Sequence, residues 1–403
     1  MHGLNADARL VTRLVAPLQS PSSCHYLGAF RTLAQKVKAI FEPLSHDPGP
    51  LEDVVAAPAE VRRDDKAMLR AAADVTRDLN VPNARIYWTD FLASAVTGYA
   101  ALALAATTAG TPVMLVAGLV SILALFRAGS FIHELTHIKK GELRGFKLGW
   151  NLIVGVPLLI PSFLYEGIHN LHHAKIRYGT VEDPEYLPLA LMKPWTLPVF
   201  LVAAMFAPLA LMFRFAVLAP LSLLSPRLRK LVVERYSGLQ INPHFRRKPA
   251  EGELARQWRW QETAASIWAI TLITLAMSGL LPRQAVLAFL VITSGTMLLN
   301  QTRTLVAHLW ENDGEPLSVT EQFLDSVNVP PPGPVAELWA PVGLRYHALH
   351  HLLPGLPYHA LPSAHRRLKD QLGADSAYHG ANYGGLFTLV GRLAVNSWRG
   401  GPA

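Results

Sequence analysis

The chain has 403 residues, of which 51% are hydrophobic and only 16% are charged. An ordinary soluble chain carries about 25% charged residues, so this composition favours a membrane protein with part of its mass in water. The single cysteine, Cys24, excludes an internal disulfide and any zinc or iron–sulfur site built from several cysteines. The net charge is +8 at pH 7. Residues 1–20 lack the compact apolar run of a cleaved signal peptide.

The first part of the chain, residues 1–86, is polar and mixed in charge. A weak helical spacing of apolar residues is present only in 57–80, and no residue pattern there indicates chemistry. We therefore expect residues 1–86 to form an N-terminal cytosolic arm. The membrane domain should cover residues 87–370, and residues 371–403 should form a C-terminal cytosolic tail.

Residues 91–126 contain no charged side chain. This run is too long for one crossing of a ~30 Å hydrocarbon core at about 1.5 Å per residue. Because Gly110 and Pro112 interrupt it, we expect two transmembrane helices, at about 91–109 and 112–132. Residues 263–302 repeat this shape around Pro282 and Arg283, which predicts helices at 263–282 and 284–302. The sequence thus predicts an all-α integral membrane protein with four transmembrane helices in two hairpins.

Histidines gather in three clusters that follow apolar or mixed segments, at 133–137, 169–173 and 347–351, and His308 follows the second hairpin. Residues three or four apart share a helix face, so each cluster can direct two or three imidazoles at one point. The nine candidate metal ligands are His133, His137, His169, His172, His173, His308, His347, His350 and His351. Nine nitrogen donors are too many for one tetrahedral zinc and suit two metal ions of higher coordination number. Imidazole suits iron, zinc, copper and nickel alike.

We expect that the other histidines do not bind metal. They are His2, His25, His46, His244, His359, His365 and His379.

Two further apolar runs, 148–165 and 194–213, each contain two prolines. If one metal site uses all the clusters, they lie on one face of the membrane. Neither run can then cross the membrane once, because a single crossing would put the next cluster on the opposite face. We therefore expect interfacial or re-entrant segments that the protein shields. The proposed outer loops carry only Arg283, whereas the other face receives most of the Lys and Arg residues. This bias places the termini and the histidine clusters in the cytoplasm.

The spacings HxxxH, HxxHH and HxxHH resemble those of the membrane fatty acid desaturase and hydroxylase superfamily. Residues 179–186 and 346–359 resemble its desaturase branch, and the resemblance covers about residues 88–370. It implies a non-haem di-iron centre in a histidine-rich cytosolic cap, held by the nine histidines, with His308 as the extra histidine after the last hairpin. Thr304 stands where stearoyl-CoA-type relatives have an asparagine, which argues against close similarity to that acyl-CoA subgroup.

The resemblance implies an oxidoreductase of lipid metabolism that desaturates a fatty acyl chain, lipid-linked or as a thioester, with O2 as co-substrate. An HPGG signature of a fused cytochrome b5 is absent, so electrons should come from a separate ferredoxin, rubredoxin or cytochrome b5 type donor. We expect no nucleic-acid partner. Carboxylates close to the clusters could accept the second ring N–H of a ligand histidine. The candidates are Glu134, Glu166, Glu182, Asp183, Glu311 and Asp313.

Three alternatives stay open. The same centre could hydroxylate or ketolate a sterol, carotenoid or sphingoid lipid, because spacing does not reveal where the oxidant meets the chain. Residues 133–137 also read HExxH, the pattern of a zinc protease with Glu134 as general base. A zinc protease would not need the other two histidine clusters. A non-enzymatic metal carrier would place its donors along the membrane crossings, whereas these donors cluster outside them.

Overall fold

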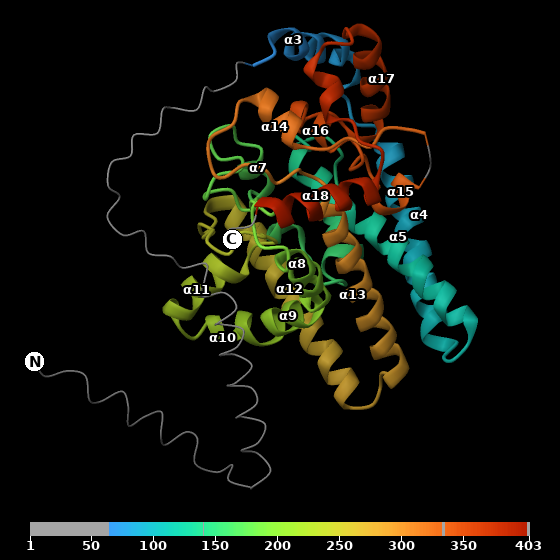
Figure 1. Ribbon diagram of the computed structural model, residues 1–403. Helices are drawn as coiled ribbons and strands as arrows, with labels where there is room; N and C mark the ends of the chain where they lie inside the picture. Colours follow the sequence, from blue (N-terminus) through green and yellow to red (C-terminus); the bar gives the residue numbers. More distant parts are fainter. Residues whose placement is uncertain (1–63, 140, 333–334, 401–403) are drawn as a thin grey trace, which may run out of the picture. The chain divides into compact units, whose positions relative to one another are not determined.

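The structure, a computed structural model, describes residues 64–139, 141–332 and 335–400 (Figure 1). These residues belong to the compact unit Val61–Ala403. In these ranges the chain forms helices, turns and isolated bridges but no strand, which confirms the predicted all-α class for this part of the chain. The predicted arm lies mostly outside the described residues.

The first hairpin consists of α4 (Ala84–Thr107) and α5 (Pro112–His137), which pack against each other. Thr111 caps α5 by accepting a hydrogen bond from the Met114 N–H, and Pro112 occupies the first turn, where no N–H is needed. Gly98 lets the helices approach closely, because a Cβ there would lie 2.6 Å from Leu125 Cδ2. The helix α5 runs on from the predicted transmembrane part at 112–132 to His137, so its last turns carry the first histidine cluster.

The second hairpin consists of α12 (Gly252–Met277) and α13 (Arg283–Leu305). The helix α12 begins before the predicted residue 263, because turns that carry Glu253, Arg256 and Glu262 are also helical. Of the described helices, α4, α5 and α13 are long and apolar enough to cross a membrane. A further segment, bent by 52°, contains α8 (Thr196–Met205), α9 (Ala207–Phe213) and α10 (Ala219–Ser222). If this segment is one span, it is a fourth candidate crossing. The crossing predicted at 263–282 stays a prediction.

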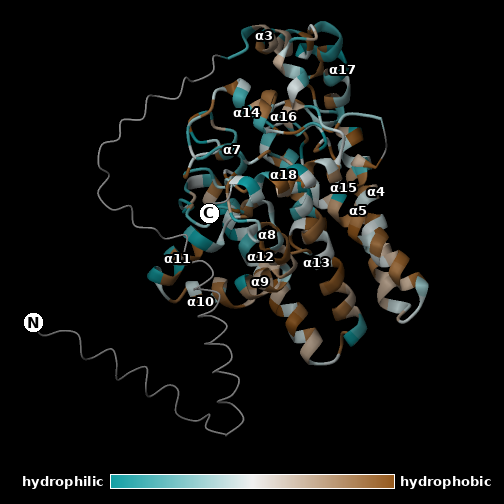
Figure 2. Cartoon of the chain, viewed as in Figure 1, coloured by the Kyte–Doolittle hydropathy of each residue, from teal (hydrophilic) through white to brown (hydrophobic). Residues whose placement is uncertain are grey.

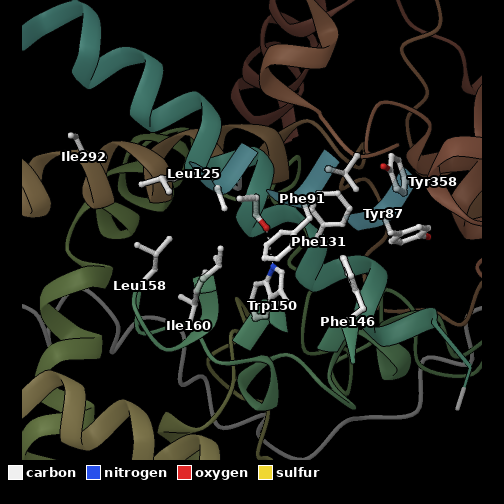
Figure 3. Packing of buried hydrophobic residues seen from close by; sticks show 14 of the residues in the cluster. Tyr87, Phe91, Leu125, Phe131, Phe146, Trp150, Leu158, Ile160, Ile292 and Tyr358 are labelled. Atoms are coloured by element: carbon white, nitrogen blue, oxygen red, sulfur yellow. Dashed lines mark hydrogen bonds between the residues drawn. The ribbon is translucent and has the colours of Figure 1, made fainter. Parts of the chain in front are cut away.

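The proline-containing run after the first cluster folds into α6 (Phe146–Trp150), a π-helical turn at Asn151–Gly155 and a 3₁₀ turn at Ser162–Leu164. The Asn151 side chain donates to Ser162 Oγ at 2.9 Å and accepts from the Ser162 N–H at 2.8 Å. Figure 3 shows Trp150, Leu158 and Ile160 in one cluster with Leu125 of α5 and Ile292 of α13. Protein groups therefore cover this irregular backbone, as a re-entrant segment requires.

Figure 2 shows a more polar part of the molecule above α13. It contains α3 (Lys66–Val75), α7 (His169–His172), α14 (Val319–Asp325), α15 (Ala336–Trp339), α16 (His347–Leu352), α17 (Leu361–Gln371) and α18 (Leu386–Gly400). The helix α11 (Pro226–Tyr236) lies lower, beside α10. Within the predicted arm, α3 packs through Met68 and Ala72 into a cluster with Leu368 of α17 and Leu349 of α16. The domain boundaries at 86 and 370 stay predictions.

Candidate metal centre

The nine candidate ligand histidines come together in two groups. The five-histidine group contains His133, His137, His169, His173 and His350, and the four-histidine group contains His172, His308, His347 and His351. In each group, one ring nitrogen from every histidine lies within 4.8 Å of the others. The last turns of α5, the short helix α7, the loop after α13 and the helix α16 supply them. Local helical spacing thus places the imidazoles of each cluster, and tertiary packing joins the clusters.

The distances between ligand nitrogens fit a bound ion in the four-histidine group. His308 Nε2 lies 3.2 Å from His172 Nε2 and 3.0 Å from His347 Nε2. His351 Nε2 lies 3.2 Å from His347 Nε2. Imidazole nitrogens that bind one ion at about 2.1 Å lie roughly 3.0–3.4 Å from their neighbours in octahedral and tetrahedral arrangements. In the five-histidine group, His173 Nε2 is 2.9 Å from His169 Nε2 and 3.0 Å from His350 Nε2.

In His172 and His308, the hydrogen bonds at Nδ1, the ring nitrogen that points away from the four-histidine group, indicate which nitrogen keeps its lone pair. Tyr178 gives its O–H to Asp325 at 2.7 Å, so at 2.8 Å it accepts from His308 Nδ1. Asp183 lies 2.9 Å from His172 Nδ1 and can only accept when ionised. A neutral imidazole with a proton on Nδ1 keeps its lone pair on Nε2. The Nε2 atoms of His172 and His308 therefore repel each other unless a cation, a proton or a metal ion, lies between them.

The pKa values of these groups follow from burial and mutual repulsion. Burial, together with the neighbouring imidazoles, lowers the pKa of His308 and of His351 well below the ordinary value. Burial acts in the same direction on His172, but the Asp183 carboxylate outweighs it and raises the pKa of that ring. His308 and His351 therefore favour the uncharged form, in which imidazole binds metal.

The five-histidine group contains buried nitrogens without a partner among the described residues. These are both ring nitrogens of His133 and Nε2 of His137. A buried polar atom left without a partner costs about 1–3 kcal/mol, so it is expected to meet a ligand. The His133 ring centroid is 4.3 Å from that of His350 and 4.4 Å from that of His169. A metal ion within this group would bind one ring nitrogen of His133 together with Nε2 of His137.

Two of the six carboxylates proposed as partners of the ligands lie beside them. Asp183 is fully buried against His172 Nδ1. Glu134 Oε1 is 3.7 Å from His133 Nδ1, and Glu134 Oε2 accepts from the Tyr358 N–H at 3.1 Å. The other four contact no ligand: Glu166 pairs with Lys147, Glu182 with Arg177, Glu311 with Arg392, and Asp313 is exposed.

The structure adds partners that the sequence did not identify. Glu185 Oε1 lies 3.1 Å from His169 Nδ1, and burial raises the pKa of Glu185 to about 7. Asp325 supports His308 through Tyr178, and burial raises its pKa to about 6. Arg303 Nη2 lies 2.9 Å from His347 Nδ1. Glu185 could have been found from its place two residues after Asp183, whereas Asp325 lies far from every cluster in sequence.

Of the histidines that we expect not to bind metal, those that the structure describes lie outside both groups. His359 Nε2 accepts from the Asn83 N–H at 3.1 Å, and His365 Nδ1 bonds to Tyr378 at 2.8 Å. His244 is exposed, and His379 Nε2 bonds to a backbone carbonyl. His2, His25 and His46 lie outside the described residues.

The geometry does not favour a protease. The Glu134 carboxylate accepts from Tyr87 and from the Tyr358 backbone, which leaves it poorly placed as a base for a metal-bound water. His169 and His350 approach His133 from the other two clusters, in space that a protease would leave to water and substrate.

Comparisons with known proteins agree with this site. The family model described as Fatty acid desaturase matches residues 109–382, more than half of the chain. A ceramide hydroxylase of Caulobacter vibrioides (strain NA1000 / CB15N) is 51% identical over 329 residues, which are 82% of this chain and 93% of that protein. No solved structure gives a significant match. The chain therefore belongs to the fatty acid desaturase family and is a multi-pass membrane enzyme of the di-iron oxygenase type.

Proposed function

We propose that this protein is an O2-dependent hydroxylase that acts on the ceramide class of lipids. The observation that carries this proposal is the 51% identity to a ceramide hydroxylase over 82% of the chain. The sequence favoured acyl desaturation, with hydroxylation as the alternative. The relative supports the alternative, and the family name alone supports desaturation.

The reaction balances as one C–H bond, one O2, two electrons and two protons giving one C–OH group and one water. Two iron ions, held by the five-histidine and four-histidine groups, would activate O2, which side chains cannot do. The electrons would come from a separate protein of the ferredoxin, rubredoxin or cytochrome b5 type.

The residues around the site orient the ligands. Asp183 and Glu185 lie at hydrogen-bond distance from the outer nitrogens of His172 and His169. Fixing these nitrogens holds the inner nitrogens toward the metal position and fixes the tautomer. The fully buried rings of Tyr178 and Trp310 flank His308, with centroids at 5.6 and 5.0 Å, and keep water from this side.

The orientation of the protein also belongs to this proposal. The predominance of Lys and Arg in the segments that join the histidine clusters supports a cytoplasmic metal centre. The substrate chain would then enter from the membrane on that side.

The test is expression in cells that contain ceramides without the corresponding hydroxyl group, followed by mass spectrometry of their lipids. We expect ceramides with one additional oxygen atom. His172→Ala should give none, although it inserts at the same level, and His244→Ala should behave like the wild type because His244 is exposed and outside both groups. Ceramides that lose two hydrogens would indicate desaturation, and unchanged ceramides would refute the substrate.

A further inference from the structure

The C-terminal helix α18 lies at the level where the membrane-crossing helices end. Its residue Leu389 belongs to a cluster that includes Trp339 of α15, and Leu299 of α13 packs against this cluster. At its other end, Ser397 Oγ donates to the Met192 carbonyl at 2.7 Å, shortly before α8 begins. Figure 1 shows α18 running across the upper end of α13. These contacts place α18 beside the cap-side ends of α8 and α13.

The outward face of α18 is apolar and has no protein cover in the described residues. Phe387 is 89% exposed, Trp398 is 80% exposed, and Val395 between them is 47% exposed. With Ala394, they follow the i, i+7, i+8, i+11 spacing of one helical stripe, whereas Leu389 and Leu393 are buried on the opposite side. An apolar stripe of this kind in water would be a liability.

The charges of α18 fit a lipid surface. The helix contains no acidic residue; of its two arginines, Arg392 is paired with Glu311 and Arg399 is exposed. An amphipathic helix with aromatic anchors and basic residues lies in the interface of a bilayer, and anionic lipids strengthen its binding. Exposed apolar residues continue on both sides, with Leu338 on α15 53% exposed and Trp195 before α8 47% exposed.

We propose that α18 docks on the bilayer that holds the protein, at the boundary between headgroups and acyl chains. Phe387 and Trp398 would be the apolar anchors, and Arg399 would lie near anionic lipid phosphates. The helix α18 packs beside α13, which is long and apolar enough to cross a membrane, and this favours a lipid rather than a protein as the occupant of its outward face.

Docking of α18 would also hold in place the residues that pack around the four-histidine group. Leu393 packs in a cluster with Tyr186 and Trp310, whose rings flank His308. Arg392 and Asn396 bond to Glu311, the residue after Trp310, at 3.0 and 2.7 Å. The buried face of α18 thus packs against residues that surround the four-histidine group.

The test uses spin labels on single cysteines of the full chain, in a Cys24→Ser background. Phe387→Cys and Trp398→Cys place labels on the outer face, and Asp370→Cys places a control label on the exposed surface of α17. The labelled proteins are reconstituted in vesicles of phosphatidylcholine and phosphatidylglycerol. Power saturation then measures access of each label to O2, which partitions into the bilayer, and to a nickel chelate, which stays in water.

We expect the labels at 387 and 398 to be relaxed more by O2 than by the chelate, and the control label to show the reverse. Chelate access at 387 and 398 equal to that of the control would overturn the proposal, because the face would then lie in water. Labels shielded from both reagents would also overturn it, because a protein or a second copy would cover the face. The readout does not depend on the activity of the enzyme.

Discussion

At the scale of single residues, Asp183 connects the backbone to a candidate ligand. Its carboxylate accepts from the Gly179 N–H and the Glu185 N–H, both at 2.8 Å, and lies 2.9 Å from His172 Nδ1. These bonds fix the carboxylate, and the carboxylate in turn fixes the imidazole. The neighbouring Glu182 lies at the surface with 66% of its side chain exposed.

We expect Asp183→Asn to weaken metal binding by about 10–100-fold, because the amide no longer offers an ionised acceptor to His172. Chelator competition on the purified protein measures this. Glu182→Gln is the matched control, since it makes the same chemical change one residue away without touching a ligand. Equal affinities in the two variants would show that the Asp183–His172 contact does not support a metal ligand.

The four-histidine group gives a second prediction at this scale. Removing His172 leaves His308 Nε2 without one of its two closest nitrogen neighbours. We expect His172→Ala to lose about one of two bound metal ions, counted by elemental analysis. A full complement of metal in this variant would remove His172 from the ligand set.

At the scale of elements, the proline-containing segment that follows the first histidine cluster depends on one side chain, Asn151. Asn151 donates to the Lys147 carbonyl and to Ser162 Oγ, and it accepts from the Ser162 N–H. It is fully buried, as are Ser162 and Gln261, which bonds to the same turn. Side chains thus supply hydrogen bonds to backbone groups of this irregular segment.

Asn151→Ala should lower the free energy of unfolding by about 1–3 kcal/mol, because it leaves buried backbone groups without a partner. Thermal unfolding in detergent measures the change. Leu148→Ala is the control within the same segment, because Leu148 is 53% exposed and should change stability little. Equal effects of the two substitutions would contradict the role given to Asn151.

At the scale of the whole molecule, nine imidazoles are gathered from distant parts of one chain, and this has a consequence for stability. Burial and mutual repulsion lower the pKa of the six rings that lie outside the spanning helices and are shifted in this direction: His169, His173, His308, His347, His350 and His351. In the unfolded chain they titrate near ~6.5. Below that pH the unfolded chain takes up protons that the folded chain does not, so acid favours unfolding.

We therefore expect the metal-free protein to lose thermal stability as the pH falls from about 7.5 to about 5.5. The raised pKa values of His172, Glu185 and Asp325 act in the opposite direction, but these three groups are fewer than the six rings. Unfolding midpoints of chelator-treated protein across this range test the prediction. A midpoint that stays constant or rises as the pH falls would contradict the prediction, because the six lowered pKa values would then not govern stability in this range.

The sequence predicted those features that depend on local pattern. The uncharged run at 91–126, broken at Gly110 and Pro112, indicated α4 and α5, and the spacing within each cluster indicated which histidines could converge. The start of α12 was missed, because its charged first turns resemble a water-exposed segment. Tyr178 and Asp325 were missed, because only tertiary packing brings them to His308.

The outcome of the reaction could not be predicted from the clusters at all. Hydroxylation and desaturation differ in where the oxidant meets the substrate chain, and the nine candidate histidines would serve either reaction. The relative therefore changes the expected product while leaving the candidate ligands as they were.

We propose that this chain inserts an oxygen atom from O2 into a ceramide. The most direct measurement is to supply the purified, iron-loaded protein with ceramide, a reductant with its electron carrier, and isotopically labelled O2, and to weigh the lipid by mass spectrometry. We predict a ceramide that has gained one labelled oxygen atom. A lipid that has lost two hydrogens, or has gained an oxygen without the label, would contradict the claim.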